Sequence, residues 1–198
     1  GASLIYGFRH NVTPEILRKA MGTGTLGKHL QKIEVHKGDV YYVPPGTVHA
    51  IGAGVMVAEI QESSNVTYRV YDYDRVDKNG MKRELHFDKA VNVMDMSIAP
   101  DVSQKPRMVR YYPGCSRELL CRCKYFEVER VQVTKGSSFS VMHSSFQVVM
   151  CLDGYGEIET SDEDRKPTRF QKGETMFLPA GIGRCRMLGD VEALKIRC

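Results

Sequence analysis

His49 ends a frame of turn-forming residues and is of a type that could bind a metal. The frame is a glycine, five residues, a proline, one residue, a second glycine, two residues and a final position. It occurs twice, 135 residues apart, as Gly38, Pro44, Gly46 and His49 and then as Gly173, Pro179, Gly181 and Arg184. A neutral imidazole can bind a divalent metal, whereas a guanidinium stays protonated and cannot. A metal role is therefore open to His49 and closed to Arg184. The alternative for His49 is a structural histidine with satisfied hydrogen bonds.

The frame has a clear effect on the backbone. Its first glycine allows a tight turn into a strand, and its Pro-x-Gly ends that strand with a second turn. An acidic residue follows the first glycine in both copies, as Asp39 and Glu174. A repeat of this length predicts two duplicated domains. We expect His49 to point from the next strand into a barrel.

The sequence pattern around this histidine changes from a helical period to an alternation of apolar and polar residues. Leu4 to Phe8 is expected to be a short strand. Thr13, Pro14 and Glu15 then predict a helix start, with Thr13 as the N-cap, and a second short helix is expected over residues 26–30. Beyond residue 31, alternating apolar residues predict strands. These strands are expected near residues 33–35, 40–43, 55–60 and 68–71.

The second half reads as another β domain behind a linker. A turn is expected at residues 77–80 and a short helix at 87–93. Strands are expected at residues 126–131, 147–152, 157–160, 174–178 and 193–196, with a turn at 153–156. Regularly spaced short strands with turn signals favour a barrel or jelly roll. The expected fold is therefore mainly β, with tandem barrels and a small helical segment at the N-terminus.

Composition excludes several classes of protein. The net charge is +4 over 198 residues and the basic residues form no stripe, so nucleic-acid binding is not expected. No apolar run is long enough for a membrane helix, and no signal peptide is expected. Six irregularly spaced cysteines, including the single C-x-C of Cys121 and Cys123, favour reduced thiols in a cytoplasmic protein.

The frame around His49 resembles the second sequence motif of cupins, in which the histidine binds a metal. Two longer stretches resemble the type I mannose-6-phosphate isomerases, in particular the short bacterial members and their carboxy-terminal part. The first is Val-Pro-Pro-Gly-Thr-Val-His-Ala-Ile-Gly at residues 43–52, and the second covers residues 59–75. Residues 84–90 and 123–126 are also similar to that family.

This resemblance implies a function and the residues that carry it. The family interconverts mannose 6-phosphate and fructose 6-phosphate by moving a proton between C1 and C2 through an enediol, with one divalent metal, usually zinc. By position, His49 would be a metal ligand. Glu59 would transfer the proton or hold the sugar phosphate, and Arg69 would stabilise the enediolate oxygen or meet the phosphate. The resemblance makes 1–31 the remainder of a helical insertion, 32–75 the later strands of a catalytic barrel, 76–108 a linker and 109–198 a structural barrel.

The sequence departs from the family in two ways. Asn65 stands where the family usually has an aspartate, and the family's upstream Gln-x-His pair does not occur in this sequence. We therefore expect weak zinc binding by this chain, and the incomplete first barrel predicts exposed sheet edges and a homodimer through them. The alternative function is a non-catalytic cupin that binds a sugar or sugar phosphate, or that serves as an interaction module. A cupin dioxygenase would need a His-x-His and Glu set, which the sequence lacks.

Overall fold

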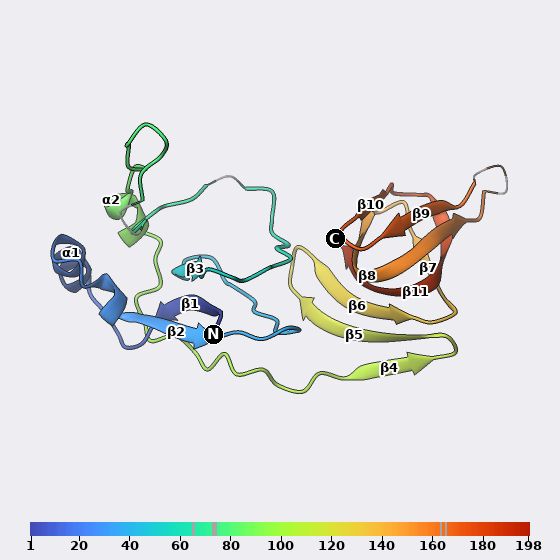
Figure 1. The fold of residues 1–198 in the computed structure, drawn as a ribbon, viewed down its shortest axis with the longest axis horizontal. Coiled ribbons are helices and arrows are strands. Elements are labelled where there is room, and N and C mark those ends of the chain that lie inside the picture. Colours follow the sequence, from blue (N-terminus) through green and yellow to red (C-terminus); the bar gives the residue numbers. More distant parts are fainter. Residues whose placement is uncertain (65, 73–74, 163, 165) are drawn as a thin grey trace. The chain divides into compact units, whose positions relative to one another are not determined.

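A computed structural model describes residues 1–64, 66–72, 75–162, 164 and 166–198. Asn65, Tyr73 and Asp74 of the family-like stretch lie outside these residues. The chain forms two compact units, Gly1–Gln104 and Lys105–Cys198 (Figure 1). None of the helices described is long and apolar enough to span a bilayer.

The first unit combines a small sheet with short helices. Its elements are β1 (Ser3–Phe8), α1 (Pro14–Gly22), the 3-10 helix η1 (Leu26–Lys28), β2 (Leu30–Glu34), β3 (His49–Ile51) and α2 (Phe87–Val91). The sheet order is β2-β1-β3, and both pairings are antiparallel. In Figure 1 the two edge strands lie on either side of β1. Among the described residues the first unit therefore has a three-stranded sheet.

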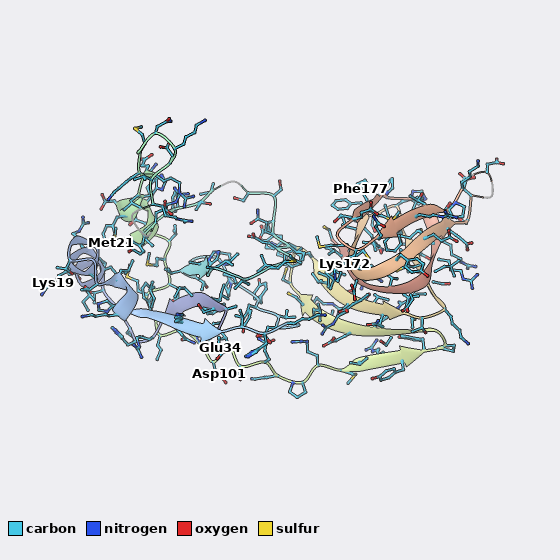
Figure 2. All side chains as sticks on the ribbon, in the orientation of Figure 1. Lys19, Met21, Glu34, Asp101, Lys172 and Phe177 are labelled. Carbon is cyan, nitrogen blue, oxygen red and sulfur yellow. The ribbon has the colours of Figure 1, made fainter. Side chains whose placement is uncertain are left out.

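The predicted start of α1 is confirmed. The Thr13 side chain accepts a hydrogen bond from the Ile16 amide at 3.4 Å, and Pro14 is the first helical residue. The helix buries Leu17 and Ala20. The core of the first unit consists of the buried residues Phe8, Val12, Leu17, Ala20 and Leu26. Met21, at the end of α1, packs against this core (Figure 2).

Three of the strands predicted for the first unit are wrong. Residues 40–43, 55–60 and 68–71 have no strand structure in the part of the chain that is described. In the second unit, the copy of residues 40–43 is a strand, β10 (Thr175–Leu178), which pairs with β8 (Gln147–Thr160). The region 135 residues before β8 contains α1 instead of a strand. Since a strand needs a neighbour for its backbone hydrogen bonds, alternation alone does not make residues 40–43 a strand.

Two of the expected boundaries fall inside the first unit. The boundary at residue 31 divides β2, which is hydrogen-bonded to β1. The boundary at residue 75 separates Asp72 from Arg83, with which it forms an ion pair. Phe87, Met94 and Met96, from the expected linker, pack against the core of the first unit. This apolar packing makes residues 76–104 part of the unit.

The second unit is almost entirely β. Besides β8 and β10, its strands are β4 (Val109–Tyr112), β5 (Cys115–Arg122), β6 (Glu127–Val133), β7 (Gly136–Val141), β9 (Thr168–Gln171) and β11 (Gly183–Arg197). The sheet order is β10-β8-β11-β6-β5-β4, with β7 paired to β11 and β9 to β8. These strands curl around a core that includes Val133, Val149 and Met187 (Figure 1).

The turn predicted at residues 153–156 is wrong. Strand β8 runs through it from Gln147 to Thr160 and pairs with β11 along its length. The register shifts between Glu192 and Ala193, so one residue of β8 is left unpaired as a bulge. Gly154, with φ of 79°, follows this bulge and allows the strand to bend without ending.

The two copies of the repeat have the same turns. The Thr47 amide donates to the Pro44 carbonyl at 3.2 Å, and the Ile182 amide donates to the Pro179 carbonyl at 3.3 Å. The acidic residues also match, since the His36 amide donates to Asp39 and the Gln171 amide to Glu174, both at 2.8 Å. Gly46 and Gly181 both have positive φ, at 86° and 78°. The frame therefore specifies local backbone geometry in both units.

We expect the substitution Gly154→Ala to destabilise the second unit by about 3 kcal/mol. Alanine at this positive φ would strain the backbone, and its Cβ would also clash with a neighbouring strand. A Cβ at this position would lie 2.1 Å from the Asp190 carbonyl oxygen, which is backbone. Gly173→Ala is the matched control, since it has a φ of 88° and no atom within 4 Å of the added Cβ. It should cost only about 1 kcal/mol. Urea denaturation of both variants tests this, and equal losses would contradict it.

Candidate functional site

His49 is the first residue of β3 and lies opposite Tyr6 of β1. Its Nδ1 lies 3.0 Å from the Thr47 carbonyl oxygen, which can only accept, so Nδ1 carries the proton. The lone pair is then on Nε2, which is the arrangement of a histidine metal ligand held by a carbonyl. The expectation that His49 points into a barrel is wrong for the described residues. The side chain is exposed, because the three-stranded sheet does not close around it.

Arg69 is held by the segment that precedes α2. Its amide donates to His86 Nδ1 at 3.2 Å, and its carbonyl accepts from the His86 amide at 2.7 Å. Its guanidinium Nη1 donates to the Glu84 carbonyl oxygen at 3.3 Å. The backbone of the half-buried Arg69 is therefore fixed, and one nitrogen of its guanidinium is held by a hydrogen bond.

Asp72 is the most strongly paired acidic residue near Arg69. Its side chain is buried and accepts from Arg75 Nη2 at 2.6 Å and from Arg83 Nε at 2.6 Å, with Arg83 Nη2 as a further donor. The hydrogen bonds from Arg83 hold the pKa of Asp72 well below its usual range, and Arg75 adds to this against the effect of burial. In return, Asp72 raises the pKa of Arg83. Asp72 is therefore ionised and holds two guanidinium groups together.

The predicted turn at residues 77–80 is confirmed and brings these groups together. The Gly80 amide donates to the Asp77 carbonyl at 3.0 Å, and the Met81 amide donates to Asp77 Oδ1 at 2.9 Å. Val76 and Lys82 form an antiparallel bridge across the turn. Residues 82–86 therefore run back beside residues 69–72. We call these two stretches the arginine clamp.

His49 and Arg69 are anchored to the same apolar core. A cavity of about 10 Å³ in the first unit is lined by Val48 and Val70, the neighbours of His49 and Arg69. Phe8 and Phe87 contribute to the same lining. The core therefore fixes the backbone beside both residues.

The predicted site residues are not joined by hydrogen bonds or ion pairs in the part of the chain that is described. Glu59 is exposed and lies in a segment without regular structure. No hydrogen bond or ion pair of the described residues joins His49, Glu59 and Arg69. No group of three or more His, Cys, Asp and Glu residues among them could hold a metal ion. A zinc site takes three or four protein ligands, so His49 fits zinc by its tautomer while the described residues as a set do not.

The second unit has a different arrangement at the equivalent position. Arg184 lies on β11 opposite Ser140 of β7 and is exposed. The preceding turn is covered by His143, whose ring would lie 2.5 Å from a Cβ on Gly181. The histidine therefore packs on the glycine that the frame requires.

Known proteins that are similar to this chain in sequence or structure include mannose-6-phosphate isomerases. Residues 117–197 match the family model of the mannose-6-phosphate isomerase cupin domain. The chain is 36% identical over 197 residues to mannose-6-phosphate isomerase ManA of Bacillus subtilis, which covers 98% of this chain and 59% of that protein. It is 35% identical over 194 residues to the mannose-6-phosphate isomerase of Streptococcus mutans, with the same two coverages. The crystal structure of the Bacillus subtilis mannose 6-phosphate isomerase superposes with a TM-score of 0.85 at 31% identity, over 99% of this chain and 60% of that one.

The chain is thus a mainly β protein of the cupin class, as its sequence predicted. Residues 117–197 match the model of the mannose-6-phosphate isomerase cupin domain, and the chain as a whole is similar to these proteins. It spans about three-fifths of the length of the curated relatives it matches.

The sequence did not single out Asp72, Arg83 and His86. Asp72 and His86 lie in stretches that resemble the family, but alternation and spacing gave neither of them a role. The available signal was the turn at residues 77–80, since a reversal there brings residues 69–75 beside residues 82–86. Such a reversal would have placed Asp72 and Arg83 on neighbouring segments.

We expect Asp72→Asn to lower kcat for mannose 6-phosphate about 10- to 100-fold in a form of the protein that isomerises it, because the clamp that orients Arg69 loosens. An amide cannot hold two guanidinium groups by charge. Asp88→Asn is the matched control, because Asp88 is 84% exposed and pairs with Arg18 in the same unit. It should leave kcat unchanged. Steady-state kinetics of both variants tests this, and equal effects would refute a role of Asp72 in positioning Arg69.

Proposed function

We propose that this chain carries part of the active site of an aldose–ketose isomerase that interconverts mannose 6-phosphate and fructose 6-phosphate. The observation that supports the proposal is Arg69, which by the family resemblance would be the active-site arginine and which is bonded to His86 and to the Glu84 carbonyl. The relatives named as mannose-6-phosphate isomerases support the same reaction.

The reaction moves a proton between C1 and C2 of the sugar through an enediol. Arg69 would stabilise the charge on the enediolate oxygen or bind the phosphate, since its guanidinium is always protonated. Glu59 would transfer the proton or hold the substrate, and its exposed carboxylate is accessible to a sugar phosphate. These two residues would provide charge stabilisation and proton transfer.

A divalent metal, zinc in the family resemblance, would polarise the carbonyl of the substrate. His49 is the one ligand that we propose from the described residues, through Nε2. The other ligands would have to come from additional chain or from a second copy of this one. The exposed edges β2 and β3 of the three-stranded sheet suit either source, and we propose a homodimer through the first unit.

The substrate proposed is a small sugar phosphate, with no role for nucleic acid or membrane. We also propose a cytoplasmic location. All six cysteines are free thiols, which suits a reducing compartment.

The test is a coupled assay of mannose 6-phosphate isomerisation with added zinc. It compares this chain with a longer form that includes upstream sequence of the same gene. Activity in the longer form alone supports the proposal and leaves His49, Glu59 and Arg69 as this chain's share of the site. Activity in neither form would overturn it in favour of the non-catalytic cupin, for which binding of mannose 6-phosphate without turnover is the expected result.

A further inference from the structure

Two imidazole rings of the first unit meet outside the residues used above. His29 Nδ1 lies 3.1 Å from His10 Nε2, and the ring centroids are 5.1 Å apart at an interplanar angle of 61°. His10 is exposed and His29 is half-buried. The proposed isomerisation gives neither residue a role.

The hydrogen bonds around His10 decide which nitrogen is free. Its Nδ1 lies 2.9 Å from the Asn11 carbonyl oxygen, which can only accept. Nδ1 therefore carries the proton, and the lone pair of Nε2 points toward His29. A ligating histidine usually donates its other ring N–H to a carbonyl in this way. His10 is therefore already in the tautomer that a metal requires.

The backbone holds both rings in place. The Arg9 amide donates to the His29 carbonyl at 2.9 Å, next to the pairing of Phe8 with Leu30 between β1 and β2. The Asn11 side chain accepts from the Ile98 amide at 2.7 Å. Both histidines thus lie at the edge of the buried core that contains Phe8 and Leu26. The distance between the rings is consequently set by the sheet.

We propose that His10 and His29 chelate a divalent late first-row metal ion, with water in the remaining positions. Two nitrogens 3.1 Å apart, each about 2.05 Å from a metal, subtend an angle of about 100° at the ion, between the square-planar and tetrahedral values. Imidazole nitrogens favour copper, nickel and zinc over magnesium or calcium. The neighbouring Arg9 and Lys28 repel cations, so the two imidazoles provide the attraction.

This site is separate from the proposed catalytic metal at His49. It uses a different pair of side chains, and it needs no residue beyond the described chain. In the metal-free chain His29 Nδ1 donates to His10 Nε2, so metal binding would require His29 to adopt the tautomer with its proton on Nε2. The metal would then replace the single hydrogen bond between the rings and would tie the end of β1 to the start of β2. The proposal stands whether or not the chain takes part in isomerisation.

The test is calorimetric titration of the chain with Ni²⁺ alone, under reducing conditions. We expect His10→Ala and His29→Ala each to weaken binding at least about tenfold, which is the loss that even an outer-shell partner can cause. The double variant should bind as weakly as either single variant, since one ligand without the other forms no chelate. In the unchanged chain, Ni²⁺ should broaden the ring NMR signals of His10 and His29 first.

Two controls separate this site from other imidazoles of the same unit. His36→Ala removes an exposed histidine whose side chain is 72% exposed, and His49→Ala removes the proposed catalytic ligand. Both variants should keep the Ni²⁺ affinity. Unchanged affinity in His10→Ala and His29→Ala would overturn the proposal, as would loss of affinity in His36→Ala or His49→Ala. Far-ultraviolet circular dichroism confirms that each variant is folded.

Discussion

Replacing Arg69 by lysine is expected to lower kcat for mannose 6-phosphate isomerisation about 10²- to 10³-fold, in a form of the protein that catalyses it. Lysine keeps the charge, but it is a point charge on a flexible stem and lacks the planar fork of arginine. In the structure, one guanidinium nitrogen of Arg69 donates to the Glu84 carbonyl. The Arg69 amide donates to the His86 ring, and the Arg69 carbonyl accepts from the His86 amide. Because the guanidinium is planar, this bond also fixes the orientation of its other nitrogens, so orienting them costs no further conformational entropy. Lysine loses this orientation, so the loss should be in kcat more than in KM.

The control for this experiment is Arg169→Lys. The Arg169 side chain is 90% exposed and lies 3.8 Å from Glu157, so the same change of residue type there should have no kinetic effect. Steady-state kinetics with mannose 6-phosphate measures both variants. A kcat for Arg69→Lys equal to that of the unchanged protein would remove Arg69 from the proposed mechanism. An equal loss in Arg169→Lys would point to a general effect on folding.

Truncating Phe8 to alanine should be the most damaging single change to the first unit, with a loss of about 3–5 kcal/mol in the free energy of unfolding. Phe8 is 1% exposed and is the largest member of a core of five buried residues. Its backbone also pairs with Leu30 and bonds to the Ala99 amide at 2.8 Å. The ring lines the existing cavity, so its removal enlarges a void that rigid neighbours cannot close.

Phe177→Ala is the matched control, because Phe177 is 62% exposed. It should change the free energy of unfolding by about 0.5 kcal/mol or less. Hydrogen exchange of the β1 amides gives the stability of the first unit separately from that of the second. Unchanged protection of β1 in Phe8→Ala would show that this core does not stabilise the unit.

The sequence determined the local elements of this protein. The start of α1 follows from Thr13 and Pro14, because an N-cap and a fixed φ act within one turn of the chain. The repeat determined two pairs of matching turns, because proline fixes φ and glycine permits positive φ wherever they occur. The same residues led to the cupin class and the isomerase family. Residues 123–126 supported this assignment only through their similarity to the family.

Tertiary structure decided which alternating segments become strands. Residues 40–43 and residues 175–178 are both apolar-rich copies of the repeat, yet among the described residues only the second set is a strand that pairs with another strand. It also decided that β8 continues through residues 153–156, since its partner β11 keeps bonding past Gly154. Alternation indicates which residues of a strand would face the core and which would face the solvent. The strands that must hydrogen-bond to it lie far away in the sequence, so alternation does not identify them.

The candidate site divides in the same way. His49, Glu59 and Arg69 were found from types and family position, whereas the arginine clamp and the His10–His29 pair were not. Both of these depend on side chains that a turn or a strand pairing brings together from separate segments. A sequence specifies which groups are present and how the chain turns beside them. Which groups meet depends on pairings across the fold, and these are set by burial and hydrogen bonding of the whole unit.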